Sequence, residues 1–155
     1  MVRTAALTLV LCVLGLGCGP MGETPGLRLG GSPASVPENF LFVRDAEVIQ
    51  LAVPGAILPR VVNIWGVGFA NSMYVWGDPG SGWVERVHAR PDQVRVRVGV
   101  DVYALSATEV TDPAERARVA DAYNDKYAEQ LREMYGRATT VDDFELFFRL
   151  SPRSP

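Results

Sequence analysis

Short segments rich in β-branched and aromatic side chains follow one another between residues 61 and 102, with turn residues between them. This feature limits the possible folds more than any other part of the sequence. Val94, Val96 and Val98 alternate with arginines, which is the period of a strand with one buried and one exposed face. All three tryptophans lie in these segments, which are Val61–Phe69, Met73–Trp76, Trp83–Val87 and Gln93–Val98.

Further strands are expected on both sides of this region. Phe40–Val43 and Val48–Val53 are apolar and enclose the polar residues 44–47, a pattern that predicts a hairpin. Val100–Val110 has the pattern of a long strand, and Phe144–Leu150 that of a last one. An apolar terminal strand needs pairing partners, so we expect it to return to the sheet and close a barrel.

One helix is predicted just before the last strand. Asp112 suits the N-cap, Pro113 the first helical position, and Glu115 completes a capping box. Gly136 is expected to end the helix. The apolar side chains that recur at helical spacing are Val119, Tyr123, Tyr127, Leu131 and Met134. A single long surface helix with one buried stripe follows from this pattern.

The N-terminal part is predicted to lie outside the folded domain. Residues 1–18 have the basic start, apolar run and small residues of an export signal, and resemble a lipoprotein signal that ends at Cys18. Ordinary cleaved secretion and an uncleaved anchor are the alternatives. Residues 19–37 are rich in Gly, Pro and Ser, which is typical of a flexible tether. The domain is then 38–152, and a lipid on Cys18 would place it on a membrane of the cell envelope.

Composition excludes several kinds of site. A chain of 155 residues suits one domain, and its net charge of −3 gives no electrostatic basis for binding nucleic acid. Cys12 and Cys18 are the two cysteines, and both lie in the predicted signal. The domain therefore has no thiol for a disulfide, a cysteine-ligated metal or nucleophilic catalysis.

Several motifs of this region resemble those of split β-barrel proteins related to the flavin-binding pyridoxamine-phosphate oxidases. More narrowly, they are similar to those of deazaflavin-dependent nitroreductase relatives and of the DUF2255 proteins. The resemblance covers roughly residues 40–152. The motifs are Asn63–Val67, Met73–Gly77, Trp83–Arg86, Arg95–Gly99, Ala104–Asp112, Tyr123–Tyr127 and Phe148–Pro152. The implied fold class is α+β, a split β-barrel of about seven or eight mostly antiparallel strands with one long helix before the last strand.

The resemblance also implies a cofactor, FMN or the deazaflavin F420, lying in a groove. In these families basic and hydroxyl residues around the first half of the barrel hold its phosphate. Nitroreductase members have a Gly-Arg-Lys-Ser-Gly type of loop where this chain has Ala56–Arg60, so Arg60 is the basic residue that matches. A homodimer with the groove at its interface is implied as well.

A candidate anion site is formed by Arg60, Ser81, Trp83 and Arg86, with the amides of Gly80 and Gly82. Trp83 is the tryptophan best placed to stack on a cofactor ring. The alternative is that the glycine-rich turn only joins two strands, that Arg86 is a surface residue, and that the tryptophans are core.

Other polar residues have simpler interpretations. His88 could be a general base but is expected to be an exposed loop residue. Asp142, Asp143 and Glu145 are expected to cap local structure rather than bind a metal. Lys126 is expected to cover the apolar stripe of the helix with its aliphatic stem.

Two functions follow from these predictions. The first is an exported, lipid-anchored barrel that serves as a cofactor-free binding module for an unknown ligand. The alternative is a flavin- or deazaflavin-dependent oxidoreductase that acts on a small substrate. No catalytic residue is predicted for either function.

Overall fold

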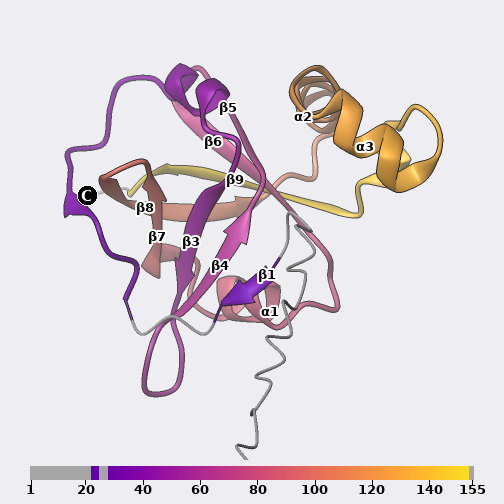
Figure 1. Cartoon of the computed structure of the whole chain (residues 1–155). Helices are drawn as coiled ribbons and strands as arrows, with labels where there is room; N and C mark the ends of the chain where they lie inside the picture. The colour runs from indigo at the N-terminus through magenta and orange to yellow at the C-terminus, as the bar shows by residue number, and fades with distance from the viewer. Residues whose placement is uncertain (1–21, 25–27, 154–155) are drawn as a thin grey trace, which may run out of the picture.

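The structure, a computed structural model, describes residues 22–24 and 28–153 (Figure 1). In this part of the chain nine strands form one sheet, with the order β1-β4-β3-β7-β8-β9-β6-β5 and with β2 paired to β8. The strands are β1 (Gly22–Thr24), β2 (Ser32–Pro33), β3 (Ile49–Val53), β4 (Arg60–Ile64), β5 (Gly66–Phe69), β6 (Ser72–Gly77), β7 (Val94–Val98), β8 (Asp101–Glu109) and β9 (Leu146–Pro152). The helices are α1 (Gly82–Ala89), α2 (Pro113–Lys126) and α3 (Ala128–Tyr135), with short 3-10 helices η1 (Leu41–Asp45), η2 (Pro91–Gln93) and η3 (Val141–Asp143).

The sheet is curled, and the connection between β4 and β5 shows why. Only Trp65 separates these strands in sequence, yet β4 lies second in the strand order and β5 lies last at the other end. The two ends of the sheet must therefore meet near Trp65. The predicted α+β split β-barrel is confirmed.

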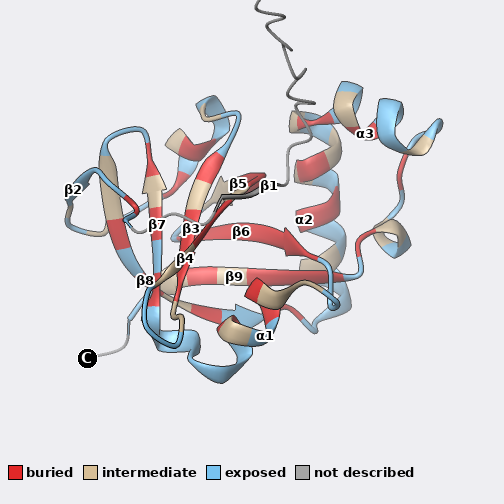
Figure 2. Ribbon diagram, turned by 60° about the horizontal axis from the view of Figure 1, so that its bottom comes forward, coloured by how far each residue is buried: buried red, intermediate tan, exposed pale blue. Residues whose placement is uncertain are grey.

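Alternating residues of the strands face two different cores. Met73 and Val75 of β6 belong to the core inside the barrel. Tyr74 and Trp76 point the other way, into a second core that Tyr123 and other residues of the helices share. In Figure 2 the buried stripe of α2 faces β6 and β9. α2 and α3 therefore cover one outer wall of the barrel, whereas the buried residues of α1 belong to the inner core.

The last strand lies inside the sheet, as predicted. β9 pairs with β6 and with β8, so that Leu150 is opposite Met73 on one side and Ala107 on the other. Its position accounts for the apolar sequence of the chain terminus, because β9 is hydrogen-bonded along both edges.

Two predicted strands were wrong. Leu41–Asp45 forms η1 instead of the first strand of a hairpin, and β3 pairs with β4 and β7. Trp83–Val87 belongs to α1, which buries Trp83, Val84 and Val87 on one helical face. A Cβ atom added to Gly77 would lie 2.8 Å from a methyl carbon of Val84, so the glycine lets α1 pack closely on the barrel.

The predicted long helix is present as two helices. The side chain of Asp112 accepts a hydrogen bond from the backbone N–H of Glu115, which confirms the N-cap of α2. The helix is interrupted at Tyr127, and α3 then ends at Gly136 with φ of 68°. Tyr127 is fully buried, and its hydroxyl group lies 2.9 Å from the carbonyl oxygen of Glu47. This contact with a distant segment accompanies the break.

Part of the range 19–37 is paired with the barrel. β1 runs antiparallel to β4, and β2 runs parallel to β8. The predicted signal and Cys18 lie outside the described residues. Among the residues that the structure describes, no helix is both long and apolar enough to span a membrane.

Candidate functional site

The first candidate region is the start of α1, which we call the α1 site and define by Arg60, Ser81 and Arg86. A Cβ atom added to Gly82 would lie 3.7 Å from Nη1 of Arg60, so this guanidinium lies beside the first residue of α1. The N-terminal end of a helix carries a partial positive charge. The sequence predicted that Arg60 and the glycine-rich turn before α1 lie close together, and the structure places them side by side.

Arg86 contributes a second cation one turn further along α1. Its Nη1 donates a long hydrogen bond of 3.5 Å to the carbonyl oxygen of Pro54. Its Nε is buried and has no hydrogen-bond partner. A buried donor without an acceptor is unfavourable by about 1–3 kcal/mol. Arg86 lines a small pocket of about 200 Å³ with Pro54, Gly55, Ala56, Ala89 and Arg90.

Polar groups of the turn before α1 form hydrogen bonds with Asp78. The carboxylate of Asp78 accepts a hydrogen bond of 2.7 Å from the backbone N–H of Gly80. The hydroxyl group of Ser81 donates to the carbonyl oxygen of Asp78, also at 2.7 Å. The amide of Gly80 is therefore engaged within the turn, and Arg60 and Arg86 are the basic side chains of the α1 site.

Trp83 lies in the barrel core instead of lining a pocket. It is 5% exposed and its ring packs against Phe148 at a centroid distance of 5.9 Å. Trp65 stacks on Tyr127 at 4.7 Å, and Trp76 meets the ring of Phe144 edge-on. All three tryptophans are buried, which agrees with the core interpretation.

A second region, the loop pocket, lies beside the α1 site. It has a volume of about 400 Å³ and is lined by Arg90, Arg95 and Arg153 from three different segments. No carboxylate is among its lining residues, which otherwise are Ala52, Val53, Pro54, Gly55, Ile57, Leu58, Pro59 and Gln93. The two pockets share Pro54, Gly55 and Arg90, so they are adjacent.

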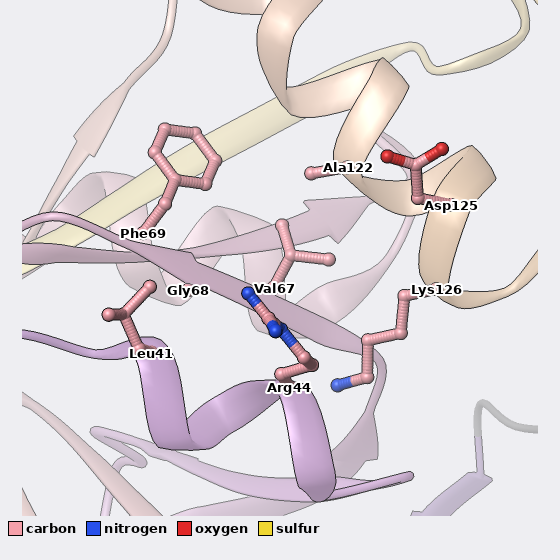
Figure 3. A pocket seen from close by; sticks show the side chains of 8 residues that line it. All are labelled: Leu41, Arg44, Val67, Gly68, Phe69, Ala122, Asp125 and Lys126. Carbon is pink, nitrogen blue, oxygen red and sulfur yellow. The ribbon is translucent and has the colours of Figure 1, made fainter.

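A third region, the Lys126 pocket, has a volume of about 490 Å³ and lies between η1, β5 and α2. Figure 3 shows Arg44 and Lys126 reaching into it from opposite elements, with Val67 and Phe69 on the strand. Asp125 lies at its α2 side. Its remaining lining residues are Leu41, Gly68 and Ala122.

Lys126 is held by the backbone and not by a carboxylate. Its ammonium group donates to three carbonyl oxygens, those of Val43, Ala46 and Gly66, at 2.6 to 2.7 Å. Desolvation by burial lowers the pKa of Lys126 from 10.5 to about 8, although the nearby Asp45 carboxylate acts in the opposite direction. The three N–H groups of the ammonium are thus used to join η1, β5 and α2. Local sequence patterns do not indicate this role, because the acceptors lie far away along the chain.

The remaining predicted polar residues have local partners. His88 is half exposed as predicted, but it lies on α1 and its Nε2 is 3.1 Å from a carboxylate oxygen of Glu109. Asp143 caps η3 together with Thr140 and pairs with Arg137 at 2.5 Å, which confirms a capping role. The hydrogen bond from Arg137 holds the pKa of Asp143 well below its usual range. In the described part of the chain, no group of three potential ligands could hold a metal ion.

No model of a protein family matches the chain, and no curated protein matches it significantly. Solved structures of several other proteins share its fold, and three of them follow. A Listeria innocua protein provisionally named pyridoxamine 5′-phosphate oxidase has 14% identity and a TM-score of 0.54, over 72% of this chain and 88% of that one. An FAD-binding protein from Mesorhizobium loti has 19% identity and a TM-score of 0.52, over 72% and 85% of the two chains.

The third structure is an F420-H2 dependent reductase, with 17% identity and a TM-score of 0.53 over 68% of this chain and 94% of that one. Identities this low are evidence for the fold alone. The chain therefore has the split-barrel fold that pyridoxamine-phosphate-oxidase-like, FAD-binding and F420-dependent proteins share.

Proposed function

We propose that this protein binds a phosphate-bearing cofactor of the flavin or deazaflavin class at the α1 site and uses it to reduce or oxidise a small substrate. The observation that carries the proposal is the pair of guanidinium groups near α1, that of Arg60 beside Gly82 and that of Arg86, which lines a pocket. The shared fold with FAD-binding and F420-dependent proteins supports the cofactor class.

The residues present fit the phosphate end of such a cofactor. Guanidinium groups bind phosphate oxygens through paired hydrogen bonds, and Arg60, Arg86 and Arg90 all lie around the β3–β4 loop and α1. The adjacent loop pocket has a volume of about 400 Å³, within the range of small-molecule sites. Its apolar wall includes Pro54 and Leu58 but no aromatic ring. A flat ring system would therefore pack on aliphatic side chains.

In this proposal the role of the chain is binding and orientation. A bound flavin or deazaflavin supplies hydride transfer. The arginines fix the phosphate, and the loop residues limit the access of water to the cofactor. No described side chain is assigned a proton-transfer role.

Titration of the purified full-length protein with FMN, FAD and F420 tests the proposal. We expect at least one of them to bind, with a change in its absorbance or fluorescence. Arg86→Gln should weaken binding about tenfold or more, because a charge-assisted hydrogen bond contributes about 1.5–3 kcal/mol. Arg132→Gln, an exposed arginine on α3, is the matched control and should bind as the wild type does. No spectral change with any of the three would overturn the proposal.

The second candidate is a binding module that takes no redox cofactor. The observation that favours it is the burial of all three tryptophans, which leaves none of them in the walls of the three pockets. This alternative predicts that inorganic phosphate binds and is weakened by Arg86→Gln, while FMN, FAD and F420 bind no more tightly than phosphate itself. The same titration series therefore separates the two functions.

We also propose that Cys18 is lipidated and that the protein resides at the membrane of the cell envelope. The signal-like sequence of residues 1–18 supports this location. In cell fractionation, Cys18→Ser should move the protein from the membrane fraction to the non-membrane fraction. Unchanged membrane retention would count against the lipid anchor. Light scattering of the purified protein tests the further proposal of a homodimer.

A further inference from the structure

The loop that joins β3 to β4 exposes two large apolar side chains. Ile57 is 93% exposed and Leu58 is 51% exposed. Figure 1 shows this loop projecting from the barrel at the bottom of the view, away from α2 and α3. Ile57 is therefore almost fully in water and Leu58 about half, at the end of a projecting loop.

Arginines surround the base of the same loop. Arg90 follows α1, Arg95 lies on β7, and Arg153 follows β9, and all three line the loop pocket. None of them forms an ion pair with a carboxylate of the described residues. The whole protein has a net charge of −3. The three arginines therefore form a local positive region on a chain that is negative overall.

We propose that this surface, formed by Ile57, Leu58, Arg90, Arg95 and Arg153, docks on an anionic phospholipid bilayer. Aliphatic side chains gain free energy when they leave water for the acyl boundary of a bilayer. Arginines near an anionic membrane gain further attraction from the lipid headgroups. A dissolved phosphate could use the arginines but would leave Ile57 in water, so the bilayer accounts for both features.

The proposal does not require Arg60, Arg86 or lipidation at Cys18, although Leu58 and Arg90 also line the pockets proposed to hold the cofactor. The carboxylates closest in sequence are Glu85 on α1 and Asp92 on η2, and neither lines the loop pocket. Charge complementarity therefore favours an anionic surface over a neutral one.

A position-specific fluorescent label provides the test. The full-length chain carries Cys12→Ser and Cys18→Ser, which remove both native thiols and the lipid site. A single Ile57→Cys is then labelled with the environment-sensitive dye NBD. With phosphatidylglycerol-containing vesicles we expect a blue shift and a rise in NBD emission, and a weaker response at high salt.

Three controls make the result specific. The same label on Val100→Cys, which is 73% exposed on the β7–β8 turn, should not respond. Adding Arg95→Gln and Arg153→Gln to the Ile57→Cys protein should weaken vesicle binding about tenfold or more. Arg86→Gln should leave the vesicle response unchanged, so failure of the cofactor proposal and failure of this one are distinguishable.

Four results would overturn the proposal. The label at position 57 could fail to respond to anionic vesicles, or respond equally to pure phosphatidylcholine vesicles. It could respond to protein concentration without vesicles, which would indicate a second copy of the chain as the partner. It could also respond to inorganic phosphate alone, which would indicate a dissolved anion.

Discussion

Lys126 on α2 donates a hydrogen bond of 2.7 Å to the carbonyl oxygen of Gly66, the first residue of β5. The same ammonium group reaches Val43 and Ala46 around η1. Lys126 is the only lysine of the sequence. One side chain thus joins the helical layer to the edge strand of the barrel and to the segment before β3.

Replacing Lys126 by methionine should therefore lower the free energy of unfolding. Methionine keeps most of the aliphatic stem but leaves three carbonyl oxygens without this donor. We expect a loss of about 2–3 kcal/mol, since each hydrogen bond contributes about 1 kcal/mol net. Urea denaturation followed by circular dichroism measures it. Arg132→Met on α3 is the exposed control and should change stability by less than about 0.5 kcal/mol. Equal stability of Lys126→Met and wild type would show that the three bonds do not stabilise the fold.

The pKa of Lys126 can be measured directly because the chain has one lysine. Burial lowers this pKa from 10.5 to about 8, and the Asp45 carboxylate opposes the shift. In protein labelled with ¹³C-lysine, the Cε resonance should titrate with a midpoint near pH 8. A midpoint near 10.5 would contradict the desolvation that the structure shows.

The lowered pKa of Lys126 makes the free energy of unfolding depend on pH, and the direction of the shift gives the sign of that dependence. Since the folded pKa lies below the unfolded one, the folded chain holds fewer protons between about pH 8 and 10.5. The pH-dependent part of the stability that Lys126 contributes is fully present above pH 10.5 and is lost as the pH falls through about 8. The difference in free energy of unfolding between wild type and Lys126→Met should therefore be larger at pH 9.5 than at pH 7, as urea denaturation at both pH values can show.

Trp83 provides a test of which side of α1 faces a ligand. Its ring is buried against Phe148, whereas Arg86 on the same helix lines a pocket. Trp83→Phe keeps an aromatic ring in the core and should leave affinity for FMN, FAD or F420 unchanged within about twofold, while Trp83→Ala should destabilise the fold by about 3–5 kcal/mol. A large loss of cofactor affinity in a stable Trp83→Phe variant would show that the indole takes part in binding.

Much of the barrel could be predicted from local sequence patterns. The alternation of Val94, Val96 and Val98 and the apolar last strand predicted β7 and β9, because one or both strand faces are buried. The N-cap residue Asp112 predicted the start of α2, since a cap depends only on residues within one turn. The Glu115 carboxylate does not complete a capping box, because it accepts from Tyr74 and Arg149.

The errors arose where a short pattern fits two structures. Trp83, Val84 and Val87 suit one face of a helix as well as a strand, and the close approach to Gly77 decides for the helix. The segment after Phe40 is as apolar as a strand but forms η1, where the amide of Phe40 binds the carbonyl oxygen of Ala70. Contacts with distant residues thus override local propensity.

The candidate site was predictable only in part. The family resemblance predicts Arg60 and the glycine-rich turn predicts Arg86, and the structure places both around the β3–β4 loop and α1. The hydrogen bonds of Lys126 could not be predicted from the sequence, because its three acceptors are backbone carbonyls 60 to 83 residues away. Backbone acceptors carry no signal in side-chain chemistry, so only the fold reveals them.

The most direct test of the account is the ³¹P NMR resonance of a bound cofactor. In a complex of the wild-type protein with FMN, FAD or F420, a phosphate resonance should shift from its position in free cofactor, because arginines would contact the phosphate oxygens. In the complex with Arg86→Gln, at cofactor concentrations that saturate the protein, the shift should be smaller. A phosphate resonance identical in the free cofactor and in the saturated wild-type complex would contradict phosphate recognition by Arg60 and Arg86.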